Sequence, residues 1–184
     1  MQLTSTQSLP VDQAKAWAAL NDIELLRSAI PGCESITPTG KDEYEVLLMA
    51  AVGPVKARFK GKLRLADIVP PQSYTLQFEG QGGAAGHGKG SAAIRLEPRT
   101  AAETLLHYEA QASVGGRLAQ VGSRLVDIAA QKMAADFFAA FSEKLRERYG
   151  EPVAEAAAPA PLGWWARLVA WFKGRLGASR GAAQ

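Results

Sequence analysis

The chain has 184 residues, 47% of them hydrophobic, and this is enough for one folded domain with a proper core. Cys33 is the only cysteine, which excludes a disulfide framework and a multi-cysteine zinc site and favours a reducing compartment. Residues 159–184 contain four of the 21 basic residues and none of the 18 acids, so the net charge of +3 arises there and does not indicate nucleic-acid binding.

The first thirty residues predict one strand and two short helices. Residues 2–8 alternate in polarity and end before Pro10, and apolar residues recur at helical spacing over 11–20 and 23–30. Pro31 and Gly32 would end the second helix. The start has neither a basic nor an apolar region, so we expect no signal peptide, and no run of 18 apolar residues could span a bilayer.

Six segments with a period of two follow, each bounded by turn residues: 34–37, 43–52, 55–69, 74–79, 91–97 and 104–114. Their short connections favour an antiparallel meander. Residues 116–149 then predict one amphipathic helix of roughly 45 Å. Its expected apolar stripe is Leu118, Val121, Leu125, Ile128, Ala129, Met133, Phe137, Phe141 and Leu145. Because so long a stripe needs a matching surface, we expect an α+β fold in which the sheet wraps round this helix.

The segment 55–65 alternates strictly and places five cations on one face of a strand. These are Lys56, Arg58, Lys60, Lys62 and Arg64. They form either a solvated face that cross-strand Glu45, Glu79 or Glu109 neutralises, or a docking strip for anionic lipids or an acidic partner.

The glycine-rich segment 80–92 resembles a phosphate loop at Gly83, Gly88 and Lys89, but Gly90 stands where Ser or Thr should bind magnesium. It favours a wide hairpin that serves as a mobile gate. The predicted gate residues are Gly82, Gly83, Gly86, His87 and Gly88. The two histidines, His87 and His107, have no paired carboxylate or activated nucleophile beside them in the pattern, so we predict neither a catalytic residue nor a metal site.

A binding cavity between sheet and helix fits the composition. Large apolar residues on the strands would face the helix, and small residues along the helix would leave space; a solid core is the alternative. The predicted lining is Tyr44, Val46, Leu48, Phe59, Leu63, Phe78, Leu125, Ala129, Met133 and Phe137.

After a folded domain at 1–149, residues 150–163 form an Ala/Pro-rich linker, 164–176 predict an amphipathic helix, and 177–184 predict a disordered tail. About 20 Å of helix is too short to cross a membrane, so we expect it to lie on one. A partner-docking helix is the alternative. The predicted membrane-binding residues are Trp164, Trp165, Arg167, Leu168, Trp171, Phe172 and Lys173.

Four motifs resemble the family of the G subunit of carbon monoxide dehydrogenase, a branch of the START-like (SRPBCC) superfamily: IPGCES, VGPVKARFKGKL, GGAAGHGKGSAAIRLEP and GGRLAQVGSRLVDIAAQKMAADFF. The resemblance covers about residues 1–148. It implies a helix-grip fold, in which a seven-stranded antiparallel sheet grips the C-terminal helix around an apolar cavity. It also implies an accessory protein of a molybdenum hydroxylase rather than an enzyme.

Cavity and membrane helix together predict a quinone-binding membrane recruiter for such a hydroxylase, peripheral on the cytoplasmic face of the cytoplasmic membrane. The domain would extract menaquinone or ubiquinone, shield its tail and present its head group to the dehydrogenase. The alternatives are a maturation factor for the molybdenum cofactor and a START-like enzyme acting on a small molecule.

Overall fold

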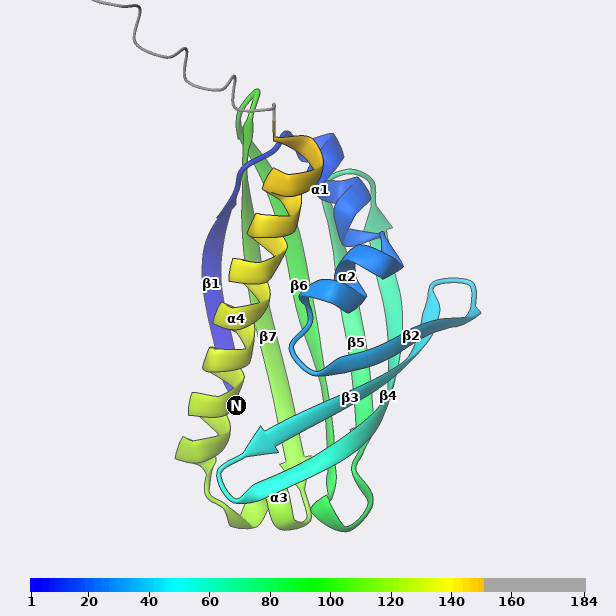
Figure 1. The fold of residues 1–184 in the computed structure, drawn as a ribbon, viewed down its shortest axis with the longest axis vertical. Coiled ribbons are helices and arrows are strands. Elements are labelled where there is room, and N and C mark those ends of the chain that lie inside the picture. The colour runs from blue at the N-terminus through cyan, green and yellow to red at the C-terminus, as the bar shows by residue number, and fades with distance from the viewer. Residues whose placement is uncertain (151–184) are drawn as a thin grey trace, which may run out of the picture. The chain divides into compact units, whose positions relative to one another are not determined.

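The structure is a computed structural model that describes residues 1–150. In this part of the chain, seven strands form one antiparallel sheet in the order β1-β7-β6-β5-β4-β3-β2, which curves round a long helix (Figure 1). The strands are β1 (Gln2–Leu9), β2 (Cys33–Gly40), β3 (Glu43–Val52), β4 (Val55–Val69), β5 (Ser73–Gln81), β6 (His87–Thr100) and β7 (Glu103–Gly115). The predicted helix-grip architecture is therefore confirmed.

Two short helices, α1 (Gln13–Leu20) and α2 (Ile23–Ala29), lie between β1 and β2. Each begins at an aspartate whose carboxylate accepts a hydrogen bond from a backbone N–H of the first turn. Asp12 accepts from Lys15 at 2.9 Å, and Asp22 accepts from Leu25 at 3.0 Å. These contacts fix where each helix starts, because they satisfy N–H groups that have no partner within the helix.

The predicted helix over 116–149 is divided in the structure. A short helix α3 (Arg117–Gln120) comes first, and α4 (Ser123–Tyr149) follows it. Gly122 separates the two with a φ of +92°, a conformation that glycine adopts without the steric cost of a side chain. The division is a correction to the sequence-based expectation, and it resets the face that α4 turns toward the sheet.

The helical stripe is correspondingly rotated at the start of α4. Leu125 is 43% exposed and Ile128 is 52% exposed, whereas Val126 is buried. Farther along, Phe141 and Leu145 are fully buried, as the stripe predicted.

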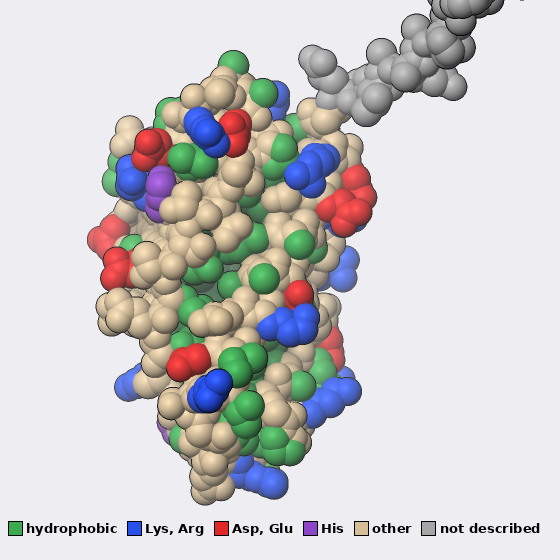
Figure 2. Space-filling view, turned by 90° about the vertical axis from the view of Figure 1, so that its left-hand side faces the viewer, with side chains coloured by type: hydrophobic (Ala, Val, Ile, Leu, Met, Phe, Trp, Pro, Cys, Tyr) green, Lys and Arg blue, Asp and Glu red, His purple; other side chains and the backbone are tan. Residues whose placement is uncertain are grey.

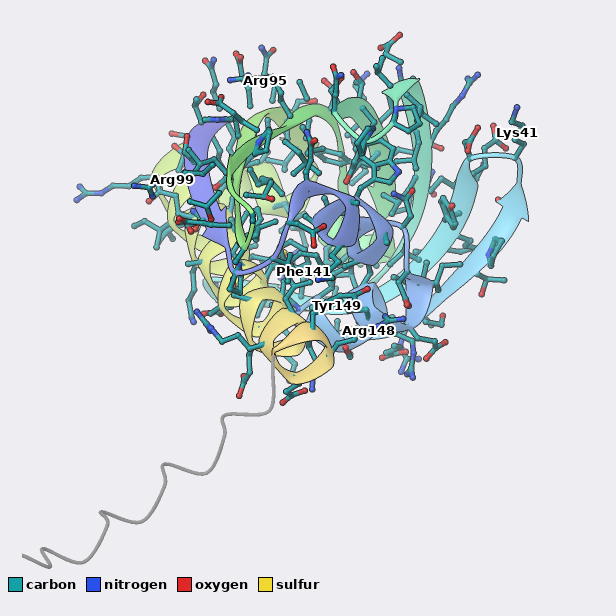
Figure 3. All side chains as sticks on the ribbon, turned by 90° about the horizontal axis from the view of Figure 1, so that it is seen from above. Lys41, Arg95, Arg99, Phe141, Arg148 and Tyr149 are labelled. Carbon is teal, nitrogen blue, oxygen red and sulfur yellow. The ribbon has the colours of Figure 1, made fainter. Side chains whose placement is uncertain are left out.

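The solid core lies where α1, α2 and the second half of α4 cover the sheet. Its most completely buried members are Leu9, Thr104, Leu106, Phe141 and Leu145. Seen from above, Phe141 points inward between α4 and the sheet, whereas Arg95, Arg99 and Lys41 point away (Figure 3). A second buried group, made of Ala85, Leu118 and Val126, comes from η1 (Gly83–Ala85), α3 and the start of α4.

Among the described residues, no helix combines the length and hydrophobicity needed to cross a membrane. The predicted linker, amphipathic helix and tail at residues 151–184 lie outside the described part of the chain. The seven predicted membrane-binding residues therefore stay a prediction.

Candidate functional site

An apolar cavity of about 450 Å³ lies between the sheet and α4. Three kinds of element form it: the inner faces of all seven strands, the end of α1 and one side of α2 with the turn after it, and the middle of α4. The space-filling view shows a hollow at mid-height with hydrophobic side chains in its walls (Figure 2). The predicted hollow is thus present in the structure. It lies between the solid core under α1 and α2 and the second buried group of Ala85, Leu118 and Val126.

Strand register explains the lining. Antiparallel partners face the same side of a sheet, so Tyr44 of β3, Leu63 of β4 and Phe78 of β5 form one row. Tyr74 of β5, Ile94 of β6 and Tyr108 of β7 form another row four residues away along β5. The cavity extends between these two rows.

Five of the ten predicted lining residues reach the cavity: Tyr44, Leu63, Phe78, Met133 and Phe137. The other five do not line it, and they are Val46, Leu48, Phe59, Leu125 and Ala129. Leu125 lies near the β3–β4 turn and remains partly exposed. Phe59 packs against Gly82, where an added Cβ would lie 2.4 Å from the Phe59 ring. On the strands the prediction found the correct face but placed Val46, Leu48 and Phe59 at the wrong height, whereas Leu125 lies on a partly exposed side of α4.

The sequence-based reasoning also missed part of the lining. Leu26 and Ile30 contribute from α2 and its end, and Ala130 and Ala134 contribute from α4. The small alanines were recognised as leaving space, but they were not assigned to the lining. Tyr74 and Tyr108 could have been found, because they lie on the same face of the sheet as Phe78 and Ile94.

The polar side chains of the cavity wall are few. They are Asn21, Tyr44, Tyr74 and Tyr108, and the described lining contains no Asp, Glu, His, Lys or Arg. The Asn21 amide donates to the backbone carbonyl of Trp17 at 2.8 Å. Burial raises the pKa of Tyr74, so this hydroxyl is neutral at physiological pH. The wall therefore offers neutral hydroxyl groups on an otherwise apolar surface.

A wider, more open hollow of about 1110 Å³ adjoins the cavity. The two share Met1, Tyr44, Leu63 and Phe78, but much of the wider hollow is lined by charged and polar side chains, such as Glu43, Lys62 and Glu79. Apolar binding requires a surface shielded from water, so the smaller cavity is the better ligand site. Glu43, Lys62 and Glu79 alternate with Tyr44, Leu63 and Phe78 along the strands, so the wider hollow lies on the outer face of the sheet and the shared residues form the wall between the two.

The predicted gate lies elsewhere. None of Gly82, Gly83, Gly86, His87 and Gly88 lines the apolar cavity. The turn is tight, with the Gly82 N–H donating to the Gly86 carbonyl at 2.8 Å, and a Cβ at Gly86 would lie 2.1 Å from the Gly115 carbonyl oxygen. His87 already pairs with Gly115 as the first residue of β6. The wide mobile hairpin is therefore corrected to a closely packed turn.

Carboxylates neutralise most of the cationic face of β4. Arg58 pairs with Glu34 at 3.1 Å and Lys60 with Glu45 at 3.0 Å. Lys62 and Glu79, and Arg64 and Glu43, lie 3.9 Å apart, at the edge of ion-pair distance. Glu45 and Glu79 thus lie beside cations of β4, as expected if this face is a solvated surface whose charges are neutralised across the strands. Exposed pairs of this kind contribute little to stability, so they fit an ordinary outer sheet surface.

The remaining reactive groups do not assemble into a catalytic centre within residues 1–150. His107 contacts Thr6 through Nδ1 at 2.8 Å and approaches Glu97 through Nε2 at 3.3 Å, away from the cavity. Burial raises the pKa of the Cys33 thiol, which disfavours the reactive thiolate. The described residues contain no group of three metal-ligating side chains.

A curved antiparallel sheet that grips a C-terminal helix around an apolar cavity defines the START-like fold. A START superfamily protein from Mycobacterium smegmatis matches it with a TM-score of 0.61 and 11% identity, over 80% of this chain and 98% of that chain. The Zhui aromatase/cyclase from Streptomyces sp. R1128 matches with a TM-score of 0.58 and 13% identity, over 81% and 96%. At these identities the likeness concerns the fold alone.

A more similar structure is a conserved protein from Geobacillus kaustophilus, with a TM-score of 0.76 and 28% identity, over 80% of this chain and 96% of that chain. The family model for the G subunit of carbon monoxide dehydrogenase (CoxG) matches residues 6–146. The chain belongs to this family, which confirms the sequence-based recognition. No curated protein matches the chain in sequence.

Proposed function

We propose that this protein is a membrane-recruited accessory protein of a molybdenum hydroxylase of the carbon monoxide dehydrogenase type, and that its cavity carries a quinone from the bilayer to that enzyme. Family membership supports the link to carbon monoxide dehydrogenase, since the family is named after a subunit of it. The single observation that carries the ligand part is the apolar cavity beneath α4.

The size and chemistry of the cavity fit part of a quinone. A volume of about 450 Å³ lies within the range of roughly 300–1,000 Å³ that holds drug-sized molecules. It would accommodate a ring and the first part of an isoprenoid chain, while a longer chain would extend through the open end. Aromatic and aliphatic walls with a few hydroxyl groups suit a ligand whose polarity is confined to carbonyl oxygens.

Membrane recruitment is proposed for the segment 164–176, which lies outside the described residues. Three tryptophans and flanking cations on an amphipathic pattern favour the head-group region of an anionic bilayer. An acidic groove on the partner enzyme is the competing binding partner for the same pattern.

Quinone extraction from vesicles tests the cavity directly. Full-length protein would be incubated with vesicles that contain menaquinone or ubiquinone, separated from them, and analysed for bound quinone. Ala92→Phe fills the cavity from β6, whereas Ala93→Phe places the same ring on the exposed outer face of the same strand. We expect Ala92→Phe to abolish quinone recovery and Ala93→Phe to preserve it. Equal recovery from both variants would show that the cavity is not the carrier site.

Vesicle flotation tests the membrane segment. Deletion of residues 160–184 should leave the protein at the bottom of the gradient, while the full chain floats with anionic vesicles. If the shortened chain still floats, the membrane contact lies in the folded domain instead. Flotation of neither protein, together with binding of the purified hydroxylase only by the full chain, would assign the segment to the partner.

The two alternatives find less support in the described residues. A maturation factor would need polar groups to hold the molybdenum cofactor, but the cavity wall is mainly apolar. A START-like enzyme would need an acid or base at the reacting atoms, and the titratable side chains of the described lining are tyrosines. The structural likeness to a cyclase concerns the fold and assigns no reaction here.

A further inference from the structure

Tyr74 is the most deeply buried tyrosine of the cavity, and its hydroxyl group has no hydrogen-bond partner among residues 1–150. Tyr74 is only 9% exposed and lines the cavity from β5. Its ring packs edge-on against Trp17, with the ring centroids 5.7 Å apart, so the side chain has a defined position. Burial is the one cause that raises the pKa of Tyr74, and no described residue forms a hydrogen bond with the Tyr74 hydroxyl group.

The described residues do not fully enclose the Tyr74 hydroxyl group. Among the described residues, the fully enclosed side-chain polar atom that lacks a hydrogen-bond partner is Nε2 of His107, not the oxygen of Tyr74. An unpartnered hydroxyl beside an apolar cavity is costly unless a ligand or a water supplies an acceptor. The Tyr74 hydroxyl group is therefore a neutral hydrogen-bond donor for which the described residues supply no acceptor.

Tyr74 marks the closed end. It belongs to the same packed cluster as Leu106 and Phe141, beneath α1, α2 and the second half of α4. The opposite end is formed by Tyr44, Phe78 and their neighbours, which lie outside that cluster. Phe78 lies four positions after Tyr74 in β5, which corresponds to about 13 Å along the strand.

We infer that Tyr74 is the specificity-determining residue of the cavity, and that it binds a carbonyl oxygen of the ligand at the closed end while the apolar chain extends toward Tyr44 and Phe78. This inference rests on the proposed quinone function and reverses the orientation expected from the sequence, in which the head group faced outward. A head group held at the closed end must leave the cavity before it reacts with the partner enzyme.

Removal of single hydroxyl groups at the two ends tests the orientation. The full chain would carry Trp164→Phe, Trp165→Phe and Trp171→Phe, so that Trp17 beside Tyr74 is the only tryptophan that reports binding. Two probes are compared: decylubiquinone, and decylbenzene, which has the same alkyl chain but no hydrogen-bond acceptor. Tyr74→Phe is the test variant, and Tyr44→Phe removes the same atom at the opposite end of the cavity. Thermal unfolding establishes that each variant folds.

We expect Tyr74→Phe to weaken decylubiquinone binding about threefold to tenfold, which is the value of one neutral hydrogen bond, and to leave decylbenzene binding unchanged. Tyr44→Phe should change neither. The inference is overturned if Tyr44→Phe weakens quinone binding as much or more, or if Tyr74→Phe weakens both probes equally. Quinone binding that both variants leave unchanged overturns the inference alone, whereas unmodified protein that binds no quinone also removes the proposed function.

Discussion

The most direct test of the structure compares the same leucine-to-alanine substitution at two positions of α4. Leu145 is fully buried and Leu125 is 43% exposed, although the sequence pattern places both on one apolar stripe. Leu145→Ala should cost about 2–5 kcal/mol of unfolding free energy, because it removes buried atoms and leaves a void in a packed core. Leu125→Ala should cost less than about 1 kcal/mol, since much of that side chain is already in water.

Urea unfolding of the full chain, followed by circular dichroism, measures both values. A loss of about 3 kcal/mol at Leu145, with a slope of about 2 kcal/mol/M, would lower the unfolding midpoint by roughly 1.5 M. The Leu125→Ala midpoint should move by less than about 0.5 M. Equal shifts in the two variants would refute the rotated helix face and restore the single stripe that the sequence predicts.

Three further predictions concern single contacts. Thr104→Val should cost about 1–3 kcal/mol in chemical unfolding, because the buried Thr104 hydroxyl donates to the Val11 carbonyl at 2.9 Å, which would lose its donor. A hydrogen bond from a backbone N–H of α2, and then one from Arg148, lowers the pKa of Asp22. The stability that the Asp22 carboxylate contributes is therefore complete above about pH 4 and is lost as the pH falls through the lowered pKa. Asp22→Asn, which also caps helices well, should reduce this loss of unfolding free energy at acid pH, as measured by unfolding at a series of pH values. Gly86→Ala should lower Tm by several degrees in calorimetry, because its φ of +112° and the nearby backbone leave no room for a Cβ, and an unchanged Tm would contradict the tight turn.

Local patterns were sufficient for much of the fold. Alternation in 43–52 and 55–69 predicted β3 and β4 with their observed bounds. The structure of the glycine-rich segment could not be predicted from its sequence pattern. β5 and β6 continue through it, with Gly80 opposite Gly88, because ladder hydrogen bonds come from the backbone and do not need side chains.

The cavity was predictable by face but not by height. Alternation shows which side of the sheet Phe59 and Phe78 occupy, and both do face inward. It cannot show that Phe59 packs on Gly82 while Phe78 borders open space, because that depends on the twist of the sheet and on where α4 begins. The break at Gly122 shifts the helical phase, and this phase decides which side chains of the first turns of α4 face the sheet.

The pairing of β1 with β7 has a consequence for how the molecule is made. Gln2 lies opposite Gln111, so the first strand must wait for nearly the whole domain to leave the ribosome before it finds its partner. Such long-range pairing slows folding, and both edges of β1 are unpaired during that time. Fragments that end before β7 should therefore need chaperones to remain soluble, whereas the completed sheet retains β1 through a full row of antiparallel partners.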